Sequence, residues 1–281
     1  VFAAALNHLD IWVRKGGRME LDMPHVLGSD GAGIVASVGE DVEKVERGDE
    51  VLINPGLPCG DCEFCRSGEQ SLCESFGILG AGRWGTFAEK VAVPVRCVAL
   101  KPSHLTFPDA AALPLDHLTA WRMLITRGRL RPGETVLIHG IGGGVAVAGL
   151  QIAKLTGAEV IATSSSNNKL AVAEQLGADH IINYTEVDDV GAMARGITGG
   201  RGVDLVMDSV GAATWDADFA AVRRGGRIVL CGVTTGAEAT TSLRALYWNQ
   251  VEVIGSTIGS DEDFRNMLDA VTTARLSPVL D

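Results

Sequence analysis

The chain has 281 residues, of which 46% are hydrophobic and 21% charged, and its formal net charge is −11 at pH 7. This length accommodates about two domains, and no stretch is apolar for long enough to predict a membrane span. The acidic balance argues against nucleic acid or an anionic membrane as partner. No signal-peptide pattern opens the sequence and its cysteines are sparse outside one cluster, so we expect a cytoplasmic protein.

Residues 1 to about 116 combine short strand-like runs with many glycines and prolines. The runs are GAGIVASVG (31–39), DEVLIN (49–54) and GTFAEKVAVP (85–94). Such a texture predicts an all-β, barrel-like module. Because Val1 already lies within a strand-like run and the chain stops directly after a helical stretch, we expect further residues beyond both ends.

A cysteine cluster interrupts this module at about residues 55–76. Cys59, Cys62, Cys65 and Cys73 follow the pattern C-x2-C-x2-C-x7-C. Four thiolates at such spacing complete a tetrahedral Zn²⁺ shell and leave no position for water or substrate. The sequence therefore predicts a structural zinc rather than a catalytic one.

From about residue 117, apolar strands alternate with helical segments. The predicted strands are residues 135–140, 158–164, 179–184, 203–209, 226–232 and 251–257. Because these strands are almost continuously apolar and mostly separated by helices, they predict an α/β domain with a parallel, doubly wound sheet.

A glycine-rich turn follows the first of these strands. Gly140, Gly143 and Ala146 are spaced three apart, and Gly144 and Val145 begin the next helix. Such a turn lets the backbone approach a pyrophosphate, which the free N–H groups of the helix then bind. The turn predicts a dinucleotide site.

The end of the second strand indicates which dinucleotide binds. Enzymes that use NAD usually place Asp or Glu there to bind the ribose 2′-hydroxyl. This chain has Ser164, Ser165 and Lys169 in a stretch without acids. Hydroxyls and a lysine suit a 2′-phosphate, so we expect NADP(H). The alternative is that these residues only form a polar turn and cap the next helix.

Taken together, these motifs resemble the medium-chain dehydrogenase/reductase superfamily, which contains the zinc alcohol dehydrogenases and the quinone oxidoreductases. The segments that carry the resemblance are ALNHLD (5–10), the stretch 28–51, LPLDHLTAW (113–121), the cysteine cluster, the glycine turn and GADHIINY (177–184). The resemblance implies a GroES-like β-barrel catalytic domain at 1–116, a six-stranded Rossmann domain at 117–259 and the start of a return to the first domain at 260–281.

Zinc-dependent members of this superfamily carry a second, catalytic metal. The three ligand positions of that metal are occupied here by Asn7, Ser29 and Leu115. A leucine cannot bind zinc, and serine and asparagine are poor ligands for it. We therefore expect the catalytic zinc to be absent, although a displaced site is conceivable with ligands from the polar residues His8, Asp30, Asp116 and His117.

Loss of these ligands changes the expected chemistry. Zinc stabilises the alkoxide-like charge that forms during hydride transfer with simple alcohols. Quinones and α,β-unsaturated carbonyls disperse that charge themselves, so hydrogen-bond donors suffice. The resemblance thus favours an NADPH-dependent quinone or enone reductase. The alternatives are an alcohol or aldehyde dehydrogenase with a rearranged metal site, and a non-catalytic NADPH-binding protein.

The resemblance also indicates which residues serve the site. Asn7, Asp10 and Thr119 match catalytic-cleft positions, although Asn7 is equally suited to capping the segment after a strand. The expected cofactor contacts are Gly140, Gly143, Gly144, Val145, Ser164, Ser165, Lys169, Tyr184, Gly232 and Val233. The apolar last strand predicts a sheet edge that pairs with a second copy, giving a homodimer or a tetramer.

Overall fold

The computed structural model describes residues 1–16 and 21–280. The chain divides into two compact units. Unit 1 comprises Val1–Leu118 together with Ile258–Asp281, and unit 2 comprises Thr119–Thr257. Each unit has its own sheet and its own buried core, and each is described separately below.

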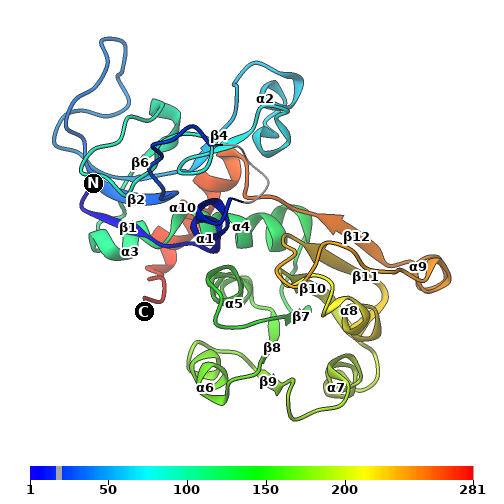
Figure 1. Ribbon diagram of the computed structural model, residues 1–281. Helices are drawn as coiled ribbons and strands as arrows, with labels where there is room; N and C mark the ends of the chain where they lie inside the picture. The colour runs from blue at the N-terminus through cyan, green and yellow to red at the C-terminus, as the bar shows by residue number, and fades with distance from the viewer. Residues whose placement is uncertain (17–20, 281) are drawn as a thin grey trace. The chain divides into compact units, whose positions relative to one another are not determined.

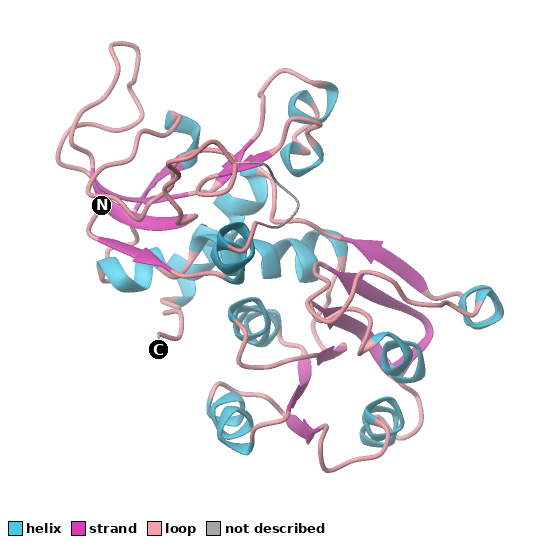
Figure 2. Cartoon of the chain, in the orientation of Figure 1, coloured by secondary structure: helices cyan, strands magenta, loops and turns pink. Residues whose placement is uncertain are grey.

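Unit 1 contains a four-stranded antiparallel sheet with the order β1-β2-β3-β6 and a separate two-stranded pair, β4-β5. Long loops connect these strands (Figure 2). The strands are β1 (Ala3–Ala5), β2 (Asp30–Ile34), β3 (Glu50–Ile53), β4 (Gly56–Leu57), β5 (Gly77–Ile78) and β6 (Val98–Leu100). The helices are α1 (His8–Arg14), α2 (Glu63–Arg66), η1 (Gln70–Leu72), η2 (Val95–Cys97), α3 (Phe107–Ala111), α4 (Pro114–Trp121), which ends in unit 2, and α10 (Asp261–Ala274).

The strand predicted at residues 85–94 is wrong, because that segment contains no strand. The amides of Gly85, Thr86 and Phe87 donate to the carbonyls of residues 26, 28 and 27 at 2.7, 2.9 and 3.0 Å. In a strand, successive N–H groups point to opposite sides. Three successive donors to one neighbouring segment therefore indicate an irregular crossing. Gly28 permits this close approach, because a Cβ there would lie 2.5 Å from the Thr86 hydroxyl.

Unit 2 contains a six-stranded parallel sheet, which confirms the predicted α/β fold. Its strand order is β12-β11-β10-β7-β8-β9. The strands are β7 (Thr135–Ile138), β8 (Glu159–Ser164), β9 (His180–Asn183), β10 (Val203–Asp208), β11 (Val222–Leu230) and β12 (Glu252–Gly255). The helices are η3 (Arg122–Arg127), α5 (Gly144–Thr156), α6 (Asn167–Gln175), α7 (Val190–Ile197), α8 (Trp215–Ala221) and α9 (Leu243–Asn249).

Helices cover both faces of this sheet. Figure 1 shows α5 and α6 on one face and α7 and α8 on the other. The strand residues alternate between two buried clusters, so that Val136 and Ile138 of β7 pack on the α5 side and Leu137 packs on the α7–α8 side. This two-sided burial explains why the strands are continuously apolar, because each side chain in turn meets a helix layer.

The order of the strands reverses between β7 and β10, which lie side by side at the centre of the sheet. The connection after β7 leads to α5 and the β8 side, whereas the connection after β10 leads to α8 and the β11 side. Open parallel sheets bind ligands at such a point, beyond the carboxyl ends of the strands. The fold therefore places the glycine turn at the position where a ligand is expected.

Candidate active site and metal centre

The four clustered cysteines come together in unit 1, between β4 and β5. Their Sγ atoms all lie within 4.8 Å of one another. The short helices α2 and η1 carry the intervening residues and turn the chain back on itself. Cys65 and Cys73 are buried, whereas Cys59 is exposed.

The sulfur arrangement fits a tetrahedral zinc ion. A Zn–S bond of about 2.3 Å requires sulfur atoms about 3.8 Å apart, and the Sγ atoms of Cys59 and Cys65 are 3.8 Å apart. The backbone N–H groups of Cys59 and Gly60 donate to the Sγ atoms of Cys73 and Cys65, both at 3.3 Å. The bond from Cys59 lowers the pKa of Cys73 to about 7. Bound there, a zinc ion would link two halves of the lobe and leave no open coordination position.

Asn7 and Asp10 form a buried polar group at the start of α1. Asn7 is the N-cap residue, and its backbone N–H donates to Asp10 Oδ2 at 2.8 Å. Asp10 Oδ1 accepts from the Gly28 N–H at 2.9 Å. Both carboxylate oxygens of Asp10 thus bind backbone amides, so this side chain braces α1 against the segment before β2.

Asp30 lies next to this group at the start of β2. Its Oδ2 accepts from Asn7 Nδ2 at 3.0 Å, and its Oδ1 accepts from the Leu115 N–H at 3.0 Å. Burial raises the pKa of Asp30 well above its usual range, against the lowering effect of the Asn7 hydrogen bond. Burial also raises the pKa of Asp116 to about 6. Unit 1 therefore holds two neighbouring acids that retain protons more readily than ordinary carboxyls.

The three positions expected for a catalytic zinc do not fit that metal. Asn7 uses one amide N–H to bind Asp30, and Leu115 contributes only its backbone N–H to the same carboxylate. Ser29 is fully buried, and its hydroxyl has no hydrogen-bond partner among the described residues. An amide, an aliphatic side chain and a serine hydroxyl do not make a zinc shell.

The glycine turn in unit 2 has the conformation that the sequence predicts. Gly140 and Gly142 have φ angles of 68° and 115°, in the left-handed region, and Gly143 is the N-cap of α5. Gly144 and Val145 form the first turn of α5, where backbone N–H groups have no intrahelical acceptor. These donors and the positive end of the helix dipole suit a pyrophosphate.

Lys169 lies against this turn, although it comes 27 positions after Gly142 in the sequence. A Cβ on Gly142 would be only 2.5 Å from Lys169 Cδ, so the glycine makes room for the lysine side chain. Ser164 is buried and its hydroxyl accepts from the Ser166 N–H at 3.2 Å, whereas Ser165 is exposed. The exposed hydroxyl and the ammonium are thus the groups of this turn that suit a phosphate.

Two further residues flank this turn, and only Tyr184 of the two was predicted. Tyr184 follows β9, is 47% exposed, and donates its N–H to the Ser164 carbonyl at 3.0 Å. Glu186, in the next loop, was not predicted as a site residue. Its carboxylate accepts from the side-chain amides of Asn167 and Asn183 at 3.0 and 2.7 Å. An acid thus lies beside the start of α6, despite its absence from residues 164–169.

Gly232 and Val233 follow β11 and pack against the loop after β10. A Cβ on Gly232 would lie 2.8 Å from the Ser209 carbonyl oxygen. The structure thus brings Gly232 and Val233 to the carboxyl end of the sheet, together with the glycine turn.

The predicted catalytic residue Thr119 lies in the second half of α4, where it is buried and 6% exposed.

Buried polar residues behind the glycine turn were also missed. His139, which precedes Gly140, and Asp218 on α8 were not predicted as site residues. Both are almost completely buried and lie close together. The sequence of α8 carries two carboxylates, Asp216 and Asp218, and nothing local distinguishes the buried one.

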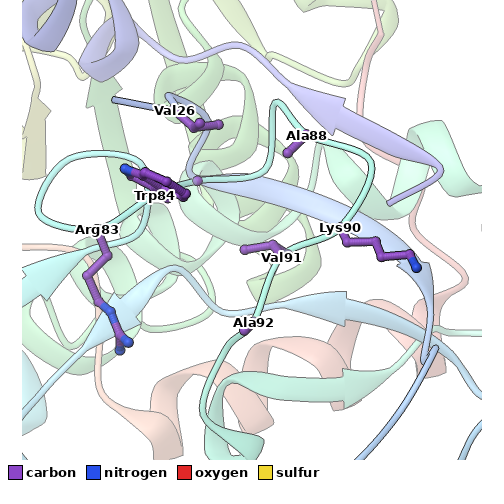
Figure 3. Close-up of a pocket in the computed structure, with 8 residues that line it drawn as sticks. Val26, Arg83, Trp84, Ala88, Lys90, Val91 and Ala92 are labelled. Carbon is purple, nitrogen blue, oxygen red and sulfur yellow. The ribbon is translucent and has the colours of Figure 1, made fainter. Parts of the chain in front are cut away.

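A separate pocket of about 380 Å³ lies in unit 1 (Figure 3). Figure 3 shows Trp84 beside Val26, with Arg83 and Lys90 extending away from each other. Its lining residues are Val26, Arg83, Trp84, Gly85, Ala88, Lys90, Val91 and Ala92. None of the predicted site residues lines it, and none of its side chains is a carboxylate, a thiol, a hydroxyl or an imidazole.

Comparison with known proteins identifies the family. Residues 1–103 match the alcohol dehydrogenase GroES-like domain, and residues 144–273 match the zinc-binding dehydrogenase family. The chain belongs to the zinc-type medium-chain dehydrogenase/reductase superfamily. The predicted family, the GroES-like and Rossmann folds and the oxidoreductase class are thereby confirmed.

Individual members of the superfamily cover nearly the whole chain. A zinc-type alcohol dehydrogenase-like protein from Schizosaccharomyces pombe is 33% identical over 99% of this chain and 81% of its own length. The crystal structure of an NAD-dependent alcohol dehydrogenase is 47% identical, with a TM-score of 0.93 over 98% of this chain and 80% of its own. A crotonyl-CoA carboxylase/reductase structure is 31% identical, with a TM-score of 0.92 over 99% and 72%. The names of these relatives thus refer to two kinds of substrate, namely alcohols and an enoyl thioester.

Within residues 1–16 and 21–280, no helix combines the length and apolar content needed to cross a membrane.

Proposed function

We propose that this protein is an NADP(H)-dependent reductase of quinones or α,β-unsaturated carbonyls that works without a catalytic zinc and keeps a structural one. The proposal is carried by the residues at the three positions expected for catalytic-zinc ligands, which are Asn7, Ser29 and Leu115. The Asn7 amide and the Leu115 backbone N–H both donate to the Asp30 carboxylate, and no strong zinc ligand stands at any of the three positions.

The nicotinamide supplies hydride when bound. The protein has to supply hydrogen-bond donors for the oxygen on which negative charge develops, and a proton. The Asn7 amide has two N–H bonds, and only one is needed to bind Asp30. We infer that the second N–H serves the substrate oxygen. Asp116, whose pKa burial raises to about 6, is the candidate proton source.

The cofactor preference for NADP(H) is supported by Lys169 and Ser165. A flexible ammonium beside Gly142 and an exposed hydroxyl at the end of β8 suit an added phosphate. Glu186 is hydrogen-bonded to the amides of Asn167 and Asn183. Several relatives are named NAD-dependent alcohol dehydrogenases, and the cofactor assays below compare NADPH with NADH.

The cytoplasm is the proposed compartment. All six cysteines are free thiols in the structure, and the four clustered ones suit zinc only when they stay reduced.

The test has two parts. Metal analysis of the purified protein is expected to give one zinc per chain. Assays with p-benzoquinone and 2-cyclohexenone are expected to show oxidation of NADPH in preference to NADH. Two zinc ions per chain with NAD-linked oxidation of simple alcohols would overturn the proposal and favour the alcohol dehydrogenase that the relatives' names suggest. Tight cofactor binding without any turnover would favour a non-catalytic binding protein.

A variant pair tests the cofactor assignment. Lys169→Gln is expected to raise the KM for NADPH about tenfold, because one charge-assisted contact to phosphate is lost. The KM for NADH should stay nearly unchanged. Lys154→Gln, near the other end of α5, is the control, since Lys154 binds Asp179. Equal losses with both cofactors would contradict a role in 2′-phosphate binding.

A further inference from the structure

A buried histidine–carboxyl contact lies behind the glycine turn in unit 2. His139 directly follows β7, and its Nε2 is 2.8 Å from Asp218 Oδ1 on α8. The two side chains are 3% and 0% exposed. The two atoms are within contact distance, although their geometry departs from that of a linear hydrogen bond.

The other ring nitrogen of His139 connects this pair to the turn. Thr163 Oγ1, on β8, lies 3.3 Å from His139 Nδ1 and accepts from the Gly140 N–H at 3.3 Å. The Thr163 carbonyl also accepts from the Ile141 N–H at 2.8 Å. One threonine thus binds two successive amides of the turn.

These contacts define a consistent direction for the hydrogens. Because Thr163 Oγ1 accepts from Gly140, its own hydrogen is available for His139 Nδ1. The neutral imidazole then carries its hydrogen on Nε2, which faces Asp218. A continuous chain of polar contacts runs from the carboxylate on α8 to the backbone of the turn.

This arrangement is costly for folding alone. Burial, reinforced by the neighbouring Asp208 carboxylate, raises the pKa of Asp218 to about 7, with His139 acting in the opposite direction. Asp208 is itself held by the N–H groups of Val210 and Gly211. Replacing buried ionic groups by apolar ones is often neutral or stabilising. A buried pair at the point where strand order reverses therefore points to a role in the ligand site.

We propose that Asp218, His139 and Thr163 are positioning residues that hold the 140–143 turn in the shape that receives the dinucleotide pyrophosphate. The inference rests on the dinucleotide site proposed above. It is independent of the choice between NADP(H) and NAD(H) and of the electron acceptor. By occupying the amides of Gly140 and Ile141, Thr163 fixes the turn and leaves the first-turn amides of α5 to the ligand.

Thr163→Val tests this role, because it removes the hydroxyl and keeps the shape of the side chain. We expect the Kd for NADPH and for NADH, measured by cofactor fluorescence, to rise about tenfold through loss of one buried hydrogen-bond bridge. At saturating cofactor, kcat should stay within about twofold, because the chemistry is untouched. Thr163→Ser should restore the affinity.

The matched control is Thr135→Val on β7. Thr135 is equally buried, and its hydroxyl donates to Glu159 at 3.1 Å, at the opposite end of the same strands. This variant should change the melting temperature without changing the cofactor Kd. An equal rise in Kd for both variants would overturn the proposal, since it would indicate general loosening of the sheet.

A second pair probes the carboxylate. Asp218→Asn keeps an oxygen acceptor for His139, whereas Asp218→Leu does not, so only the leucine variant should weaken cofactor binding.

If the wild type binds a cofactor tightly and Thr163→Val binds it equally well, the positioning role is refuted and the proposed function stands. If the wild type binds neither cofactor, both fail.

Discussion

The chemistry available in unit 1 depends on a small group of side chains around Asp30. Leu115 has an aliphatic side chain, and the side-chain amide of Asn7 donates to Asp30. Asp116 lies close enough to Asp30 to raise its pKa. Burial therefore raises the pKa of both Asp30 and Asp116.

The raised pKa of Asp116 predicts a pH-dependent stability. Its folded-state pKa is about 6, whereas an unfolded Asp titrates near about 4. The folded state binds more protons between these values, so the free energy of unfolding falls as pH rises from about 4 to about 6. Asp116→Asn removes this term. We expect its stability relative to the wild type to increase by about 1–2 kcal/mol between pH 4 and pH 7, measured by urea unfolding.

The control for this measurement is Asp41→Asn, which changes an exposed acid of the same unit. A pH-dependent gain of the same size in the control would show that net charge, and not the burial of Asp116, produces the effect.

Among the elements, the cysteine lobe depends most on something other than its own packing. The strands β4 and β5 have two residues each, α2 has four and η1 has three. Elements this short do not stabilise themselves. A tetrahedral zinc links residues 59–65 to residue 73 and thereby replaces a hydrophobic core.

Removal of zinc is therefore expected to loosen the lobe while the Rossmann unit stays folded. Cys65→Ser should lose the bound zinc and show faster hydrogen exchange at residues 56–78, with exchange in β7–β11 unchanged. Mass-spectrometric hydrogen exchange provides the measurement. Cys231→Ser, outside the cluster, should retain one zinc per chain, and full zinc retention by Cys65→Ser would refute the four-cysteine site.

At the scale of the whole molecule, the edge of the parallel sheet predicts an assembly. β12 is the terminal strand and pairs only with β11 within the described chain. The Ser256 N–H donates to the Leu230 carbonyl, so by strand alternation Val253 directs its backbone groups outward. Val253 is 43% exposed, and Leu243, Tyr247 and Trp248 are more exposed on the adjacent α9. We propose that two copies pair through β12.

Val253→Pro tests this pairing, because proline removes the outward N–H and leaves the contacts with β11 in place. The wild type is expected to sediment as a dimer or tetramer, whereas this variant should shift to a smaller species with an unchanged circular dichroism spectrum. Val253→Thr retains the N–H and should keep the wild-type assembly. A proline variant with the wild-type mass would contradict pairing through this edge.

Local patterns in the sequence were sufficient for much of the fold and of the site. Six apolar β-branched runs were enough to predict the parallel sheet, because burial on both faces demands such residues. The cysteine spacing and the glycine turn after β7 could be predicted as a sulfur cluster and a tight turn, since each depends on residues close in sequence. The strand expected at residues 85–94 failed, because its irregular crossing of residues 26–28 is set by contacts between distant glycines.

Only the tertiary structure decided how distant residues act on one another. The sequence named Asn7 and Asp10 as equivalent candidates, whereas folding engages both Asp10 oxygens with backbone amides and directs the Asn7 amide to Asp30. The pairing of His139 with Asp218 spans 79 positions in the chain and has no local pattern. The physical reason is that hydropathy and turn preferences are local properties, whereas the protonation and orientation of a buried polar group depend on whichever segments the fold brings to it.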